Sequence, residues 1–392
     1  EFTRAKTARS SKEDGWLEMY QNYRGLYGPN TQFTDKEKSR AFIKITKTKV
    51  LASYAQIIDV MFAGGKFPIG IEDRNYPRNV AGEVNYDPSQ LTKEKVKEKT
   101  GVDYDVPRKY SRPDIEKDLG IYADILQPVH DQLNKGTGDS PEALMWEPDK
   151  IAALKMERKI HDQLAETGAS KHLRKLAFEQ SLFGTGILKG PFAFDKEYPK
   201  WSDGEYTPEF DTIPKVEARS IWSIYPDPEA LNMDEATYLV DRHRMSKTQL
   251  RKLNSRPMFR KESIRTAIDY GPSYVPEHWE VAMEQNATTG ASTRYEVLEY
   301  WGVVDREILE DADLDIPEEF DDEDELQVNI WICNGQILRL VMNPFTPTRI
   351  PYHAVPYEVD PYSFWGVGTA ENMLDTQLLM NGFMRMAVDN AA

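Results

Sequence analysis

Residues 362–392 are the most informative segment of the chain and read YSFWGVGTAENMLDTQLLMNGFMRMAVDNAA. It opens as a turn with two glycines, Gly366 and Gly368, and continues as an apolar-rich segment. No glycine or proline follows its last large apolar residue, Val388, although these residues often mark a helix end. The segment therefore predicts a long helix that has not ended where the sequence stops.

The predicted helix has a recognisable start. Thr369 is its expected N-cap, and Glu371 lies in the first turn, where a negative charge suits the helix dipole. A helix over residues 369–391 would be on the order of 35 Å long at ~1.5 Å per residue. Its apolar residues spread around more than one face, which favours neighbours on several sides. The alternative is an ordinary core helix inside one domain.

Composition limits the class of protein. The chain has 392 residues, 40% of them hydrophobic and 29% charged, which suggests two or three packed units. No apolar run reaches the ~18–20 residues of a membrane-spanning helix, so we expect no membrane partner. The start at Glu1-Phe2 suggests a fragment of a longer protein. The net charge of −16 argues against a surface that grips DNA, but not against one past which DNA slides.

Helical patterns dominate the first half of the chain. Residues 1–40 form an expected N-terminal arm, in which Trp16, Leu17, Tyr20 and Tyr23 share one helical face. A strong helix is predicted over 42–62, followed by a loop-rich insertion over 72–150 with a helix at 115–133. Two further helices are predicted over 149–166 and 172–183.

Strand patterns follow. Asn334-Gly335 separates two alternating runs and is a strong signal for a two-residue hairpin. Ser246 and Gln249 form a capping box before a short helix over 247–253. This order of elements predicts an α+β fold with antiparallel strands. The predicted strands are 187–194, 214–218, 237–243, 295–304, 326–333 and 336–342.

Motifs of enzymes and metal sites are incomplete. The segment around Gly64-Gly65-Lys66 resembles a P-loop, but Val60 and Phe67 occupy the positions of its first glycine and its hydroxyl residue. The lone cysteine, Cys333, lies in an apolar run and is expected in the core. We therefore expect no catalytic residue, no cofactor and no metal site. The histidines lack paired-ligand spacing; they are His130, His161, His172, His243, His278 and His353.

An acidic run occupies residues 310–325, with eleven carboxylates and no basic residue. Asp311, Asp313 and Asp315 have calcium-loop spacing, but Ile316 stands where such a loop needs glycine. We expect an acidic loop over 307–325 that connects two strands and is solvated. A surface that repels or binds a partner is the alternative.

Four segments, in order along the chain, resemble the portal protein of tailed bacteriophages of the podovirus type. They are FEQSLFGTGILK (178–189), VEARSIWSIYPDP (216–228), EVLEYWG (296–302), and IPYHAVPY (350–357). The last leads through FWGVG (364–368) into the terminal helix with Asp375, Gln377 and Asn381. The resemblance covers roughly residues 40–392 and is carried by the order of these motifs.

The resemblance implies a non-enzymatic ring, usually a dodecamer, that forms the DNA channel at one capsid vertex of the virion. Residues 41–362 would form the wing and 363–392 the start of the stem helix, with clip and crown missing. Implied partners are the major capsid protein, terminase, head–tail adaptor or tail proteins, and double-stranded DNA, with assembly in the host cytoplasm. Arg385 would face the channel or a neighbouring subunit. The implied ring contacts are Met373, Leu374, Leu378, Phe383, Met384 and Val388.

Two other functions stay open at this point. One is another virion structural protein, such as a head–tail adaptor. The other is a metal-dependent hydrolase that uses carboxylates of the acidic run or Asp360. Convergence of two or three carboxylates on one point would favour the hydrolase, and the symmetry of the assembled particle would identify an adaptor.

Overall fold

The computed structural model describes residues 1–28, 31–34, 37–63, 67, 69–71, 148–202, 205–207, 209–283, 293–311, 316, 320, 323–345 and 349–391. Two compact units are present, Glu1–Phe67 with Gln163–Ala392, and Pro68–Asp162. Most of the predicted insertion, including its helix at 115–133, lies outside the described residues. The same holds for Gly64-Gly65-Lys66 and for most of the acidic run. The first unit carries every feature discussed below.

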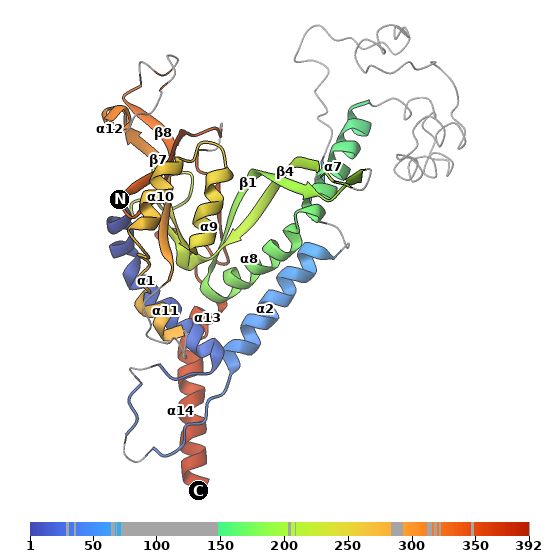
Figure 1. Ribbon diagram of the computed structural model, residues 1–392. Helices are drawn as coiled ribbons and strands as arrows, with labels where there is room; N and C mark the ends of the chain where they lie inside the picture. The colour runs from blue at the N-terminus through green and yellow to red at the C-terminus, as the bar shows by residue number, and fades with distance from the viewer. Residues whose placement is uncertain are drawn as a thin grey trace, which may run out of the picture. The chain divides into compact units, whose positions relative to one another are not determined.

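Long helices line one side of the first unit (Figure 1). They are α1 (Phe2–Arg24), α2 (Ile45–Phe62) and α8 (Ala169–Phe183), while α7 (Pro148–Glu166) spans the boundary between the units. The N-terminal residues contribute to the core, because the Trp16 ring meets the rings of Trp222 and Trp365 edge to face. Gly25 ends α1 in the left-handed conformation, with φ 78°.

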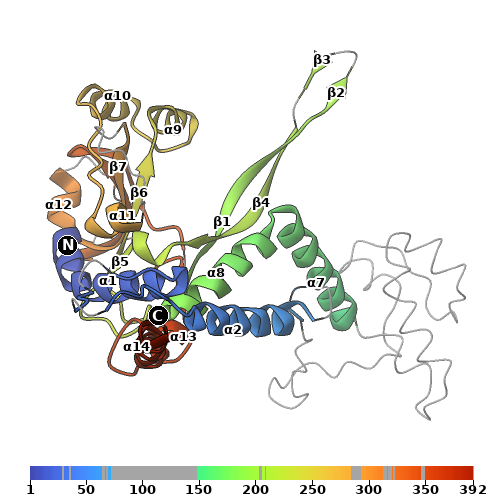
Figure 2. The ribbon, with the colours of Figure 1, turned by 90° about the horizontal axis from the view of Figure 1, so that it is seen from below.

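A three-stranded antiparallel sheet has the order β10-β1-β4. It consists of β1 (Thr185–Tyr198), β4 (Glu209–Arg219) and β10 (Tyr352–Pro356). The far ends of β1 and β4 lead into a second short pair, β2 (Trp201–Ser202) and β3 (Glu205–Tyr206), so that a long ribbon projects from the sheet (Figure 2). The sequence predicted the inner parts of β1 and β4 but neither β10 nor the tip.

A five-stranded antiparallel sheet follows the chain order β5-β6-β7-β8-β9. Its strands are β5 (Ile224–Pro226), β6 (Tyr238–Met245), β7 (Tyr295–Asp305), β8 (Glu325–Cys333) and β9 (Gln336–Met342). Asn334 and Gly335 join the last two with φ of 51° and 72°, so the predicted hairpin is confirmed. Together with the helices, these sheets confirm the α+β class.

Short helices cover the connections of this sheet. Between β6 and β7 lie α9 (Lys247–Lys252), a 3₁₀ turn η4 (Leu253–Ser255), α10 (Lys261–Asp269) and α11 (His278–Met283). Between β7 and β8 lies α12 (Arg306–Asp311). The predicted capping box is present, with Gln249 and Ser246 bonded reciprocally. Cys333 is buried beneath α9 and α10, as predicted.

The glycine-rich turn before the terminal helix lies against the start of β1. The amide of Gly366 donates to the Thr185 hydroxyl at 2.8 Å, and Tyr357 donates to the Gly184 carbonyl at 2.8 Å. A Cβ on Gly184 would stand 2.1 Å from the Gly366 oxygen, so this backbone approach requires glycine. Two glycine turns that are remote in sequence thus pack together.

The terminal helix differs from the prediction in its first turns. It is divided into α13 (Thr369–Asn372) and α14 (Leu374–Ala391) by a turn at Met373. The expected N-cap was wrong, because Gly368 is the cap residue and the Thr369 hydroxyl bonds Ser53 at 3.1 Å. Because this turn packs on α2 and β1, the Thr369 side chain bonds Ser53 of α2 and does not cap its own helix. No helix among the described residues is long and apolar enough to cross a membrane.

Candidate subunit-contact helix and a buried ionic cluster

One side of α14 carries four polar residues at intervals of four, Gln377, Asn381, Arg385 and Asp389. Residues so spaced lie along one helix face. Gln377 and Asn381 are only 1% and 4% exposed. The polar side of the helix therefore faces the chain's own body, where an amphipathic helix ordinarily turns its apolar side.

The partner of this polar stripe is an extended segment, residues 37–44, which we call the strap, together with the first turn of α2. The Asn381 oxygen accepts from the Ile43 amide at 3.0 Å, and Asp389 accepts from the Ser39 amide at 2.7 Å. Gln377 accepts from the Thr46 amide at 3.0 Å. These side chains supply the partners that the strap's backbone lacks outside regular structure.

Arg385 belongs to the same contact. Its guanidinium donates to the Tyr27 hydroxyl at 3.0 Å and lies 3.5 Å from the Glu37 carboxylate. The hydrogen bond to Tyr27 and the charge of Glu37 raise the pKa of Arg385, although partial desolvation opposes them. The residue proposed from sequence as a channel or intersubunit charge thus has partners within its own chain.

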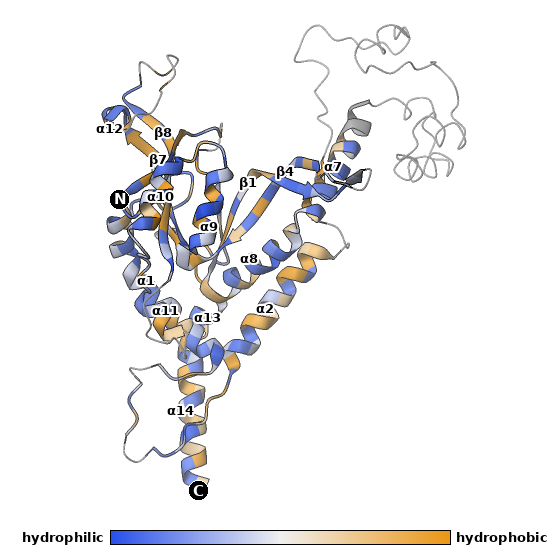
Figure 3. Ribbon diagram, viewed as in Figure 1, coloured by the Kyte–Doolittle hydropathy of each residue, from blue (hydrophilic) through white to orange (hydrophobic). Residues whose placement is uncertain are grey.

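The remaining sides of α14 carry mostly apolar residues (Figure 3), and most of these are exposed. Leu378 is 68% and Phe383 61% exposed, and Met384 and Val388 are also exposed. Of the six predicted contact residues only Met373 and Leu374 are half-buried. Leu379 and Met380, which were not among the predicted contact residues, are also apolar and exposed. Exposed apolar area on this scale is characteristic of a surface that other chains cover.

A second feature is a cluster of charged side chains between the two sheets. Glu299 on β7 accepts from Lys189 on β1 at 2.6 Å and lies 2.8 Å from His243 Nε2. Asp241 on β6 accepts from Arg219 on β4 at 2.7 Å. Asp241 and Glu299 are almost fully buried. The cluster therefore joins the three-stranded sheet to the five-stranded sheet by paired charges.

Hydrogen bonding fixes the protonation pattern of this cluster. Arg219 Nη2 lies 3.2 Å from His243 Nδ1 and can only donate, so Nδ1 accepts and Nε2 carries the proton towards Glu299. Burial alone would raise the pKa of Glu299, but Lys189 and His243 outweigh it and hold that pKa well below its usual range. Burial beside Asp241 raises the pKa of Tyr352, whose hydroxyl donates to that carboxylate at 3.0 Å.

This cluster also contains a set of side chains of the kind that binds metals. One ligand atom each of Asp241, His243 and Glu299 lies within 4.8 Å of the others. However, Lys189 and Arg219 already supply a cation to each carboxylate. The arrangement suits a structural joint better than a metal site. The sequence did not predict this cluster, because its residues come from four strands that are far apart in the chain.

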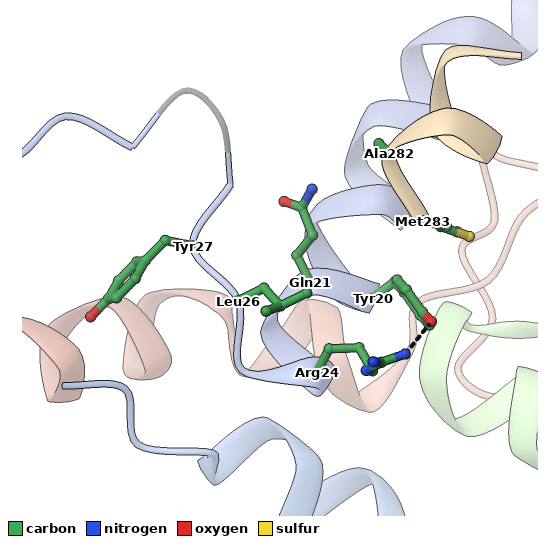
Figure 4. Close-up of a pocket in the computed structure, with 7 residues that line it drawn as sticks. All are labelled: Tyr20, Gln21, Arg24, Leu26, Tyr27, Ala282 and Met283. Atoms are coloured by element: carbon green, nitrogen blue, oxygen red, sulfur yellow. Dashed lines mark hydrogen bonds between the residues drawn. The ribbon is translucent and has the colours of Figure 1, made fainter. Parts of the chain in front are cut away.

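A pocket lies where the end of α1 meets α11 (Figure 4). Its volume is about 260 Å³, below the ~300–1,000 Å³ usual for ligand clefts. Among the described lining residues Arg24 is the only charged one, and it donates to the Tyr20 hydroxyl at 2.9 Å. The other polar side chains of the lining are Gln21, Tyr20 and Tyr27.

Comparison with known protein families matches residues 203–392 to the family described as the phage SU10 portal protein. The match includes the five-stranded sheet, β10 and the whole of α14. These residues form a phage portal protein domain, in agreement with the resemblance found in the sequence. The match supports a phage portal protein, which is a structural protein of the virion. No curated protein shows a significant match to the chain.

Proposed function

We propose that this chain is a non-enzymatic subunit of a ring-shaped portal through which double-stranded DNA passes during packaging and ejection. The family match supports a portal role. The main observation in favour of a ring is the orientation of α14. Its polar stripe faces its own chain, and its apolar sides are exposed. A helix exposed in this way is stabilised when other copies pack against it.

In this proposal α14 is a stem helix and the sheets belong to the wing, over residues 41–362. Neighbouring copies cover Leu378, Phe383, Met384 and Val388, and the ring is a dodecamer. The net charge of −16 supports passage of DNA without adhesion or sequence specificity. Further partners are the major capsid protein, terminase and head–tail proteins, at the capsid vertex of a virion assembled in the host cytoplasm.

The test is assembly of the full-length protein. Wild-type protein should form closed rings in electron micrographs, and Leu379→Ser with Phe383→Ser should shift it to monomers, because both changes remove apolar contact area. The matched control is Val60→Ser with Val359→Ser, which alters two exposed apolar residues outside α14. Rings that form equally well with the α14 changes would contradict the proposal.

The two alternative functions have less support. A head–tail adaptor would also form symmetric particles, but the family match names a portal. A carboxylate-metal hydrolase needs free ligands, whereas both buried carboxylates of the one described ligand cluster are paired with Lys189 and Arg219. Titration calorimetry with Mg²⁺, Mn²⁺ and Ca²⁺ would detect such a site, and we expect no binding.

A further inference from the structure

The five-stranded sheet carries two charged connections at its opposite ends. Because β6, β7 and β8 are consecutive antiparallel neighbours, the β6–β7 connection leaves from one end and the β7–β8 connection from the other. The 11 residues of β7 separate these ends by about 35 Å at ~3.3 Å per residue. Figure 2 shows α9 and α10 well apart from α12.

The first connection is strongly basic. Residues 246–270, which we call the basic cap, comprise α9, η4 and α10 and contain seven basic and two acidic residues. Its hydrophobic side packs on β8 and β9, so the charges are directed outward. Burial and the nearby charge of Arg256 lower the pKa of Arg339 beside the cap. The exposed basic residues, for which the described part of the chain provides no ion pair, are Lys247, Arg251, Lys252, Arg256, Lys261 and Arg265.

The second connection is strongly acidic. Residues 305–311 and 323–325, which we call the acidic end, contain seven acidic residues and one basic residue, Arg306, which pairs with Glu310 at 2.7 Å. Leu309 holds α12 to the sheet, because it is buried in a cluster that Phe320 packs against. The described carboxylates are all exposed; they are Asp305, Glu307, Glu310, Asp311, Glu323, Asp324 and Glu325.

We propose that the basic cap of one copy binds the acidic end of the next copy around the ring. This inference rests on the proposed function, because it supplies an orienting contact between ring neighbours. The two surfaces are complementary in charge, and the length of the sheet keeps them apart within one chain. Contact between copies through two different surfaces is head-to-tail, which is the geometry that generates rings.

Charge complementarity has a clear role in a chain of this composition. Copies with a net charge of −16 repel one another, so a local attraction selects the productive orientation. A basic cap could also bind nucleic-acid phosphates. The second copy is favoured because the acidic end places seven described, exposed carboxylates beside a single described cation, Arg306.

The experiment uses full-length protein and three variants. The cap variant carries Arg251→Glu, Lys252→Glu and Arg256→Glu, the acidic-end variant carries Glu307→Lys, Asp311→Lys and Glu323→Lys, and the swap variant carries all six. Each triple variant should raise the protein concentration needed for rings about tenfold at low salt, and the swap should return it to within about twofold of wild type. Wild-type rings should weaken as salt rises.

The control is Lys12→Glu, Lys49→Glu and Lys171→Glu, which changes net charge by the same amount as the cap variant at exposed sites elsewhere. Circular dichroism and thermal unfolding establish that each variant is folded. Unchanged assembly in both triple variants, or a swap that restores nothing, would refute the contact. Loss of binding to a short DNA duplex in the cap variant, with rings intact, would assign the cap to DNA. Wild-type protein that forms no rings would instead refute the proposed function.

Discussion

At the scale of single residues, Glu299 is the carboxylate on which the joint between the sheets depends. It accepts from Lys189, from the Trp301 indole at 2.7 Å and from His243, so each of its oxygens is satisfied. Burial of such a charge is tolerated only while these partners remain. Removal of the Glu299 carboxylate leaves the largely buried Lys189 without its counterion, and this lowers the free energy of unfolding.

We predict that stability falls in acid because of this residue. The folded pKa of Glu299 is depressed below its ordinary value of 4.5, so the unfolded chain binds its proton first. The contribution is complete above about pH 5 and is lost progressively as the pH falls. Denaturant titrations at several pH values should show this slope reduced in Glu299→Gln, which should also lose about 3–5 kcal/mol near neutral pH.

Glu307→Gln serves as the matched control, since Glu307 is exposed on α12 and has no ion pair among the described residues. It should change stability by less than about 0.5 kcal/mol. A Glu299→Gln protein with wild-type stability and an unaltered pH profile would show that the cluster does not hold the sheets together.

At the scale of elements, the predicted features were those encoded by adjacent residues. The β8–β9 hairpin was predictable because Asn334-Gly335 specifies its turn locally, and the helix at α9 because Ser246 and Gln249 cap it. The strand β10 and the ionic cluster were not predictable, because their partners come from remote strands. The expected cap at Thr369 failed for the same reason, since packing against Ser53 decided its role.

The glycine contact between β1 and the turn before α13 gives a prediction for Gly184→Ala. The new Cβ would stand 2.1 Å from the Gly366 oxygen at a residue with φ of +88°, so both a clash and backbone strain result. We expect a loss of about 3 kcal/mol or more in the free energy of unfolding. Gly168→Ala separates the two effects.

Gly168 has a similar φ of +68° but no neighbouring atom within 4 Å of its Cβ position. Its substitution should therefore cost only the strain of a left-handed residue, about 1–2 kcal/mol. Equal losses for both variants, measured by urea unfolding, would mean that the close approach at Gly184 adds nothing.

The strap gives a second prediction at this scale. Asn381→Leu removes the oxygen that accepts from the Ile43 amide and leaves that amide without its partner. We expect residues 37–44 to exchange amide hydrogens about tenfold faster or more, as an unsatisfied buried group costs about 1–3 kcal/mol. Leu379→Ala, on an exposed side of α14, should leave strap exchange unchanged. Slow exchange in both variants would refute the role of Asn381.

At the scale of the whole molecule, two kinds of surface serve one assembly in the proposed ring. The exposed apolar sides of α14 supply contact area, and the charged ends of the five-stranded sheet supply direction. Apolar burial stabilises contacts without specifying orientation, whereas charge complementarity specifies orientation at little net gain. The strap keeps the polar stripe of α14 engaged, so only the apolar sides remain for neighbours.

Thiol chemistry can test which sides neighbours cover. The single cysteine, Cys333, is buried, and burial raises its pKa to about 11, so it should react slowly with maleimide. A cysteine introduced by Phe383→Cys should react rapidly in monomers and at least about tenfold more slowly in assembled rings, because neighbours exclude the reagent. Val359→Cys, exposed outside α14, should react equally in both states. If Phe383→Cys forms rings and its thiol reacts equally fast in monomers and rings, the proposed role of α14 is wrong. Neighbouring subunits would then contact one another through surfaces other than α14.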